Sequence, residues 1–135
     1  MTVGKSPAKV AFDDIAPDQR RGGDLRVLLS PRTAGATSGF MGALQLRPGE
    51  RISAHRHPYS EEFLYVVRGS VVLSTGGGDP VALSADESVM TPKDVPHLLE
   101  NNGTEVAFVV FHLSPLAPRP DLGHVDEELP AKEAG

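Results

Sequence analysis

Short apolar stretches alternate with turn residues along most of the chain. From residue 25 onward, runs of apolar or alternating residues are separated by segments rich in glycine, proline, asparagine and aspartate. This spacing is typical of β-strands joined by tight turns, and no stretch carries a 3.6-residue apolar repeat of helical length. The pattern predicts about eight to ten strands in an all-β sandwich or barrel.

Two of the predicted strands are apolar on both faces. Residues 63–67 read F-L-Y-V-V, and residues 106–113 read V-A-F-V-V-F-H-L. A strand of this kind is normally covered on both sides. One face therefore packs inside the barrel, and the other needs a flanking segment or a partner subunit. We expect a homodimer.

The length of 135 residues fits one domain. We divide it into an N-terminal arm and first strand region (1–24), a barrel (25–118) and an acidic C-terminal tail (119–135). Cysteine is absent, so disulfides and thiolate ligands are excluded, and any metal must be held by nitrogen and oxygen. No apolar run approaches the ~20 residues of a membrane span, and the N-terminus lacks a signal-peptide pattern. We therefore expect a cytoplasmic protein with no membrane partner.

The formal net charge of −5 is uneven along the chain. Five acids and one lysine between residues 121 and 135 account for −4 of it, so the rest is nearly neutral. A nucleic-acid partner is therefore not expected. The simplest interpretation of the acidic segment is a solvated terminus.

The densest chemistry lies between residues 49 and 69. His55 and His57 are two residues apart, so in a regular strand their imidazoles share one face. The acidic pair Glu61 and Glu62 opens the next apolar strand and could approach the same point. This arrangement indicates a metal site, although two histidines near a turn can also be exposed and incidental.

Two other features carry possible chemistry. The doublet of Arg20 and Arg21 could grip an acidic substrate, or it could be a solvated loop beside the glycine turn. Gln45 alternates with Leu44 and Leu46, and is either an exposed amide or a buried one that needs partners.

The two histidine-bearing segments together resemble the cupin superfamily. Its first motif, G-x5-H-x-H-x4-E-x6-G, is matched in full by Gly49, His55, His57, Glu62 and Gly69. Its second motif, G-x5-P-x-G-x2-H-x3-N, is matched by Pro92, His97 and Asn101, with Asp86 and Asp94 in place of its two glycines. Aspartate tolerates turns and left-handed backbone, so the ligand position is kept. The resemblance implies a single-domain double-stranded β-helix, or jelly-roll barrel.

The resemblance also implies a ligand set for a divalent metal: His55, His57, Glu62 and His97. Three imidazoles and one carboxylate suit zinc, which we expect first, or iron, nickel, copper or manganese. Glu61 points the opposite way in a regular strand. Gln45 and His112 are further candidate ligands. His112 shares a strand phase with Val106, Phe108 and Val110, and could reach the metal if that phase faces inward. His124, in a segment bounded by proline and glycine, is expected to be structural or exposed.

A narrower resemblance covers nearly the whole chain. The segments R-R-G-G-D-L-R-V-L-L-S-P, H-P-Y-S-E-E-F-L-Y-V-V-R-G and H-L-S-P-L-A-P-R-P-D-L-G-H-V-D look like the small cupin polyketide cyclases of resistomycin-type and tetracenomycin-type antibiotic pathways in bacteria. This resemblance implies metal-dependent aldol ring closure of a poly-β-ketone, delivered on an acyl carrier protein or released from it, alone or with other cyclases. Glu62 and His112 are the expected proton carriers.

Two alternatives remain open at this point. The same ligands with ferrous iron suit an oxygenase that acts on an aromatic polyketide intermediate. A cupin that only binds a ligand, or that acts as a chaperone in a cyclase complex, would fit the motifs equally well.

Overall fold

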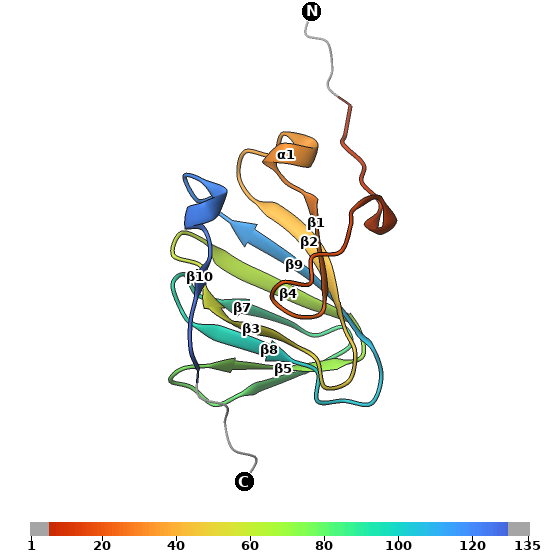
Figure 1. The fold of residues 1–135 in the computed structure, drawn as a ribbon, viewed down its shortest axis with the longest axis vertical. Helices are drawn as coiled ribbons and strands as arrows, with labels where there is room; N and C mark the ends of the chain where they lie inside the picture. The colour runs from red at the N-terminus through yellow and green to blue at the C-terminus, as the bar shows by residue number, and fades with distance from the viewer. Residues whose placement is uncertain (1–5, 130–135) are drawn as a thin grey trace, which may run out of the picture.

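A computed structural model describes residues 6–129 as two five-stranded sheets, with almost no helix (Figure 1). The all-β prediction is confirmed. Every strand pair within residues 6–129 is antiparallel, as expected for strands joined by tight turns. The elements are η1 (Phe12–Asp14), β1 (Asp24–Leu29), α1 (Pro31–Ala34), β2 (Phe40–Leu46), β3 (Arg51–Arg56), β4 (Glu61–Arg68), β5 (Ser70–Thr75), β6 (Val81–Ser84), β7 (Ser88–Thr91), β8 (His97–Glu100), β9 (Ala107–Ser114), η2 (Pro120–Leu122) and β10 (Val125–Asp126).

The chain passes repeatedly from one sheet to the other. One sheet has the order β1-β2-β9-β4-β7 and the other the order β10-β3-β8-β5-β6. Strands that follow one another, such as β3 and β4 or β8 and β9, therefore lie in different sheets. The core fills the space between the sheets, and its aliphatic side chains come from both. This winding is the double-stranded β-helix that the motifs imply.

Alternating burial along the strands shows which side chains face the core. In β9 the buried residues are Ala107, Val109, Phe111 and Leu113, while the residues between them face outward. In β4 the same alternation buries Glu62, Leu64 and Val66. The outward phase of β4 leaves three large apolar side chains 41–45% exposed, namely Phe63, Tyr65 and Val67. The homodimer stays a prediction, and this row is where we expect the contact.

Two aspartates adopt the backbone conformation that favours glycine. Asp86 has φ = 68° and Asp94 has φ = 67°, at the two positions where the second motif has glycine. Each carboxylate is anchored: Asp86 accepts a hydrogen bond from the Tyr65 hydroxyl (2.6 Å), and Asp94 binds Arg56. The expectation that aspartate preserves these turns is confirmed.

The C-terminal segment differs from the sequence-based expectation. Residues 120–127 are not a solvated tail, because β10 pairs with β3 and aligns Val125 with Arg56 and Asp126 with His55. Glu127 extends the contact by donating its backbone N–H to the Ala54 carbonyl (3.0 Å). A two-residue strand leaves no periodic signal in the sequence, which explains the error. Residues 130–135 of the predicted tail and 1–5 of the predicted arm lie outside the described residues.

Candidate metal centre

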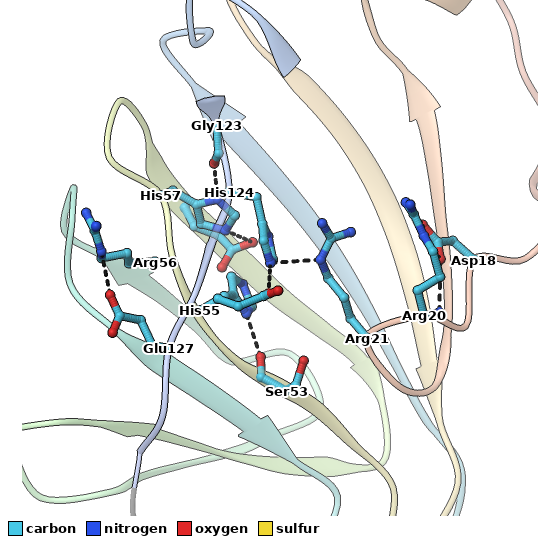
Figure 2. A network of polar contacts seen from close by, with 12 residues as sticks. Asp18, Arg20, Arg21, Ser53, His55, Arg56, His57, Gly123, His124 and Glu127 are labelled. Carbon is cyan, nitrogen blue, oxygen red and sulfur yellow. Dashed lines mark hydrogen bonds and ion pairs between the residues drawn. The ribbon is translucent and has the colours of Figure 1, made fainter. Parts of the chain in front are cut away.

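Four buried side chains from both sheets converge on one point between the sheets. His55 lies in β3, and His57 is the first residue after that strand. Glu62 is the second residue of β4, and His97 is the first residue of β8. All four are buried, and one donor atom from each lies within 4.8 Å of the others. That span is slightly more than twice a metal–ligand bond of about 2.0–2.2 Å. Figure 2 shows His55 and His57 side by side in the polar network around this point.

Strand register accounts for the convergence. His55 in β3 lies opposite His97 in β8, and their ring centroids are 4.4 Å apart. Glu62 is on the inward phase of β4, whereas Glu61 is exposed, so the sequence-based distinction between the two carboxylates holds. The four residues that both motifs nominate are therefore brought together.

Backbone carbonyls set the orientation of all three rings. The Nδ1 atoms of His55, His57 and His97 lie 2.7, 2.8 and 2.9 Å from the carbonyls of Ser53, Gly123 and Val95. A carbonyl oxygen can only accept, so each Nδ1 carries a proton, and Nε2 is the ring nitrogen left to bind a metal. This is the outer-shell arrangement that orients histidine ligands toward a metal.

The Nε2 atoms are poorly satisfied without an ion. Within residues 6–129, the buried Nε2 atoms of His57 and His97 have no hydrogen-bond partner. Both nitrogens face the same carboxylate: His97 Nε2 lies 2.8 Å from Glu62 Oε1, and His57 Nε2 lies 3.8 Å from Oε2. Orphaned buried nitrogens beside a carboxylate are the donor set a divalent metal requires, so the residues fit one.

Burial keeps two of the imidazoles neutral. Desolvation, together with the nearby His97, lowers the pKa of His55 to about 3. Desolvation also lowers the pKa of His57, against the attraction of Glu62. For His97, burial again opposes protonation, but contact with Glu62 outweighs it and raises the pKa. Burial of Glu62 favours the neutral acid, yet the histidines lower its pKa, so the carboxylate remains ionised.

The structure does not bring His112 or Gln45 to this centre. His112 is exposed on the outer face of the β9 sheet, opposite Phe63, because the inward phase of β9 is the other one. Gln45 pairs with Phe108 on that outward phase, since Leu44 and Leu46 occupy the inward positions of β2. From these outward positions neither side chain reaches the four candidate ligands, so the structure gives no support to Gln45 or His112 as an additional ligand or to His112 as a proton carrier.

The C-terminal segment supplies neighbours that the motifs do not include. The Gly123 carbonyl holds His57, and the half-buried His124 ring stacks on His55 at 4.5 Å with an interplanar angle of 15°. His124 Nε2 lies 2.8 Å from both Arg21 Nε and Asp126 Oδ1. One nitrogen cannot accept from Arg21 and donate to Asp126 at once. A guanidinium always donates, and burial lowers the pKa of His124, so we assign a neutral ring that accepts from Arg21.

A buried hydroxyl also adjoins the cluster. Thr91 in β7 is directly opposite Glu62 in β4, and Leu113 in β9 lies opposite it on the other side. Thr91 is 2% exposed, and its Oγ1 has no hydrogen-bond partner within the described residues. The only signal in the sequence that could have suggested Thr91 as a neighbour of this site is its inward-facing position in a short strand.

Comparison with known proteins places this site in a family. A model of the cupin domain matches residues 43–113. Protein SchB of Streptomyces halstedii is 59% identical over 119 residues, covering 88% of this chain and 86% of SchB. Polyketide synthase CurC of Streptomyces cyaneus is 57% identical over 125 residues (93% and 80% covered). Tetracenomycin polyketide synthase protein TcmJ of Streptomyces glaucescens is 48% identical over 121 residues (90% and 80% covered).

Solved structures agree on the fold. An uncharacterised double-stranded β-helix protein from Klebsiella pneumoniae superposes with a TM-score of 0.70 at 19% identity, covering 87% of this chain and 95% of that one. A predicted oxalate decarboxylase from Thermotoga maritima superposes with a TM-score of 0.68 at 23% identity, covering 80% of this chain and 99% of that one. At these identities the likeness concerns the fold alone. With the matching domain model, the two motifs and the three-histidine, one-glutamate cluster, this chain belongs to the cupin family.

Proposed function

We propose that this protein is a metal-dependent polyketide cyclase that closes rings by aldol condensation in an aromatic polyketide pathway. The observation that carries the proposal is the convergence of three imidazoles and one carboxylate, with the proton of each imidazole held on Nδ1 by a backbone carbonyl. It is supported by close relatives that are named as polyketide synthase proteins.

The residues that would hold the metal are His55, His57, Glu62 and His97. Zinc is our first expectation, with iron, nickel or manganese as alternatives. A divalent ion bound there supplies Lewis acidity toward a carbonyl oxygen, which can lower a barrier by several kcal/mol. The coordination sphere is not completed by Gln45 or His112, so these four residues leave room for a substrate oxygen.

Glu62 is the proposed proton carrier. In the aldol step, the carbon between two carbonyl groups loses a proton to the carboxylate and attacks a ketone carbon. That attack closes the ring, and the proton then returns to the new alkoxide oxygen. Loss of the resulting hydroxyl, together with a hydrogen of the neighbouring carbon, as water leaves a carbon–carbon double bond. The ionised state of the buried Glu62 suits the first of these transfers.

The neighbours of Glu62 suit a folded ketone chain. Leu113 presents an apolar side chain on one side of it, and on the other Thr91 presents a hydroxyl that has no hydrogen-bond partner among residues 6–129. An apolar wall excludes water, and a hydroxyl can hold one carbonyl oxygen. Fixing the reacting carbon near its target carbonyl supplies an entropic advantage. The substrate would reach the site on an acyl carrier protein or after release from it, and other cyclases of the pathway are possible partners.

An oxygenase is the second candidate, because the same donor set suits ferrous iron. Elemental analysis separates the two candidates. Zinc is redox-silent, and its presence would remove the basis for oxygen activation. Stoichiometric iron, with oxygen consumed in the presence of an aromatic intermediate, would favour the oxygenase.

The test combines metal content with product analysis. A minimal polyketide synthase is reconstituted with and without this protein, and the products are identified by mass spectrometry. His55→Ala and His97→Ala should lose bound metal and cyclisation together, while His112→Ala, which removes an exposed histidine of the outer face, should keep both. Cyclisation by metal-free protein would contradict the proposal, and cyclisation only when partner cyclases are added would favour a chaperone role.

A further inference from the structure

The structure separates the two arginines of the Arg20/Arg21 doublet. Arg20 turns to Asp18, with its Nε 3.0 Å from Oδ1 and its Nη2 2.8 Å from Oδ2. Its side chain is 78% exposed. Arg21 instead extends to the metal centre and donates from Nε to His124 Nε2 at 2.8 Å. Figure 2 shows the Arg21 guanidinium beside His124 and the Arg20 side chain beside Asp18.

The loop that carries Arg21 is fixed against β3. The Arg21 carbonyl accepts a hydrogen bond from the Ser53 N–H (2.8 Å), two residues before the ligand His55. Gly22, at φ = 102°, packs so closely that a Cβ there would lie 1.9 Å from the Arg51 carbonyl oxygen. Only glycine fits that contact, so the position of Arg21 is built into the fold.

A single imidazole separates Arg21 from the ligands. His124 accepts from its Nε and stacks on His55 at 4.5 Å, with His57 at 5.7 Å. The guanidinium therefore lies beside the candidate metal centre, on the side of the C-terminal segment.

The far end of this guanidinium is unused. Within residues 6–129, neither terminal nitrogen of Arg21 has a hydrogen-bond partner, and no carboxylate oxygen lies within 4.0 Å of the group. The residue is only partly exposed. A half-buried charge beside a reaction centre with free donors is suited to an anionic partner from outside the chain. In Figure 2 these nitrogens point away from Ser53.

We propose that Arg21 binds the substrate through the oxygens of a 1,3-dicarbonyl unit, an inference that rests on the proposed cyclase function. A planar guanidinium offers paired N–H donors, which match two neighbouring oxygens better than an ammonium group does. An enolised 1,3-dicarbonyl presents two such oxygens and becomes negatively charged when its central carbon loses a proton. Arg21 orients that unit and stabilises its charge, while the proton goes to Glu62.

The test measures binding of methyl 3,5-dioxohexanoate, a short poly-β-ketone ester, to the metal-loaded full-length protein by titration calorimetry. Charge-assisted hydrogen bonds contribute about 1.5–3 kcal/mol, so Arg21→Gln should weaken binding by at least about 10-fold. The affinity of Arg21→Lys for the ester should lie between those of Arg21→Gln and the parent. Arg20→Gln is the matched control. Its affinity should stay within about 2-fold of the parent's, because the Arg20 guanidinium is already hydrogen-bonded to Asp18.

Metal content and urea midpoint, measured on each variant, distinguish lost recognition from a damaged site. Equal binding by Arg21→Gln and the parent would overturn the inference and leave the cyclase proposal standing, provided the parent still forms rings. Weaker binding accompanied by loss of metal would also overturn it, since Arg21 would then act through the centre. A parent that neither binds the probe nor cyclises would remove the proposed function and this inference with it.

Discussion

Acidification of the metal-free protein should destabilise it through His55. The unfolded chain protonates this imidazole near pH 6.5, whereas in the folded state burial and the neighbouring His97 lower its pKa to about 3. Between these values the unfolded state binds a proton that the folded state does not. The free energy of unfolding therefore falls as the pH falls, at up to about 1.4 kcal/mol per pH unit for His55 alone.

The range from pH 6.5 to pH 5 avoids most of the contributions of His97 and Glu62. The pKa of His97 is raised, so its contribution is lost as the pH rises above 6.5 and is fully present below. The pKa of Glu62 is lowered, so its contribution is lost only below about 4.5. Protonation linked to His55 should then lower the free energy of unfolding by about 1.5–2 kcal/mol across this range. His57, whose pKa is also lowered, acts in the same direction.

Urea unfolding with a chelator present provides the assay. Circular dichroism is the signal, since the chain has no tryptophan. The parent should lose stability between pH 6.5 and pH 5, and His55→Asn should lose about 1.5–2 kcal/mol less over the same range. His112→Asn, which replaces an exposed histidine, should behave like the parent. An equal loss in the parent and in His55→Asn would refute the assignment of a buried, neutral imidazole at this position.

Two further predictions concern the fold and its assembly. Asn101→Ala should lower the free energy of unfolding, measured by urea titration, by about 2–4 kcal/mol. The fully buried amide of Asn101 donates to the Leu46 and Glu105 carbonyls and accepts from the Gly103 N–H. Asn102→Ala, at an exposed neighbour, should change the free energy of unfolding little. The parent should sediment as a homodimer at micromolar concentration, and the Phe63→Lys variant should sediment as a monomer. The reason is that Phe63 belongs to the exposed apolar row of β4. A monomeric parent would contradict this prediction.

The fold was predictable because strand and turn signals are local, and the four candidate ligands were predictable from the resemblance to the two cupin motifs. Strand alternation and turn residues indicate β-structure, and His55 and His57 share a face as soon as their strand is known. The aspartates at 86 and 94 also behave as their chemistry predicts, since each accepts a left-handed backbone.

The remaining features depend on phase and on long-range pairing. In an apolar strand such as β9 both phases look alike, so the sequence could not tell whether His112 or Phe111 faces the core. Gln45 presents the same ambiguity. The contacts of His124 and Arg21 span 103 residues of sequence separation, and the pairing of β10 with β3 involves only two residues of β10. No periodic pattern can reveal a contact of that kind.

Arg56 shows how the outer layer of the site is linked across the chain. It lies between His55 and His57, and its guanidinium binds Asp94 and Glu127. Asp94 belongs to the turn before His97 and donates its N–H to the His57 carbonyl (2.8 Å), while Glu127 ends the segment whose Gly123 carbonyl holds His57. Such partly exposed ion pairs contribute little to stability. Their consequence is geometric: one side chain ties together the segments that orient His57 and present His97, so the ligand geometry depends on residues outside both motifs.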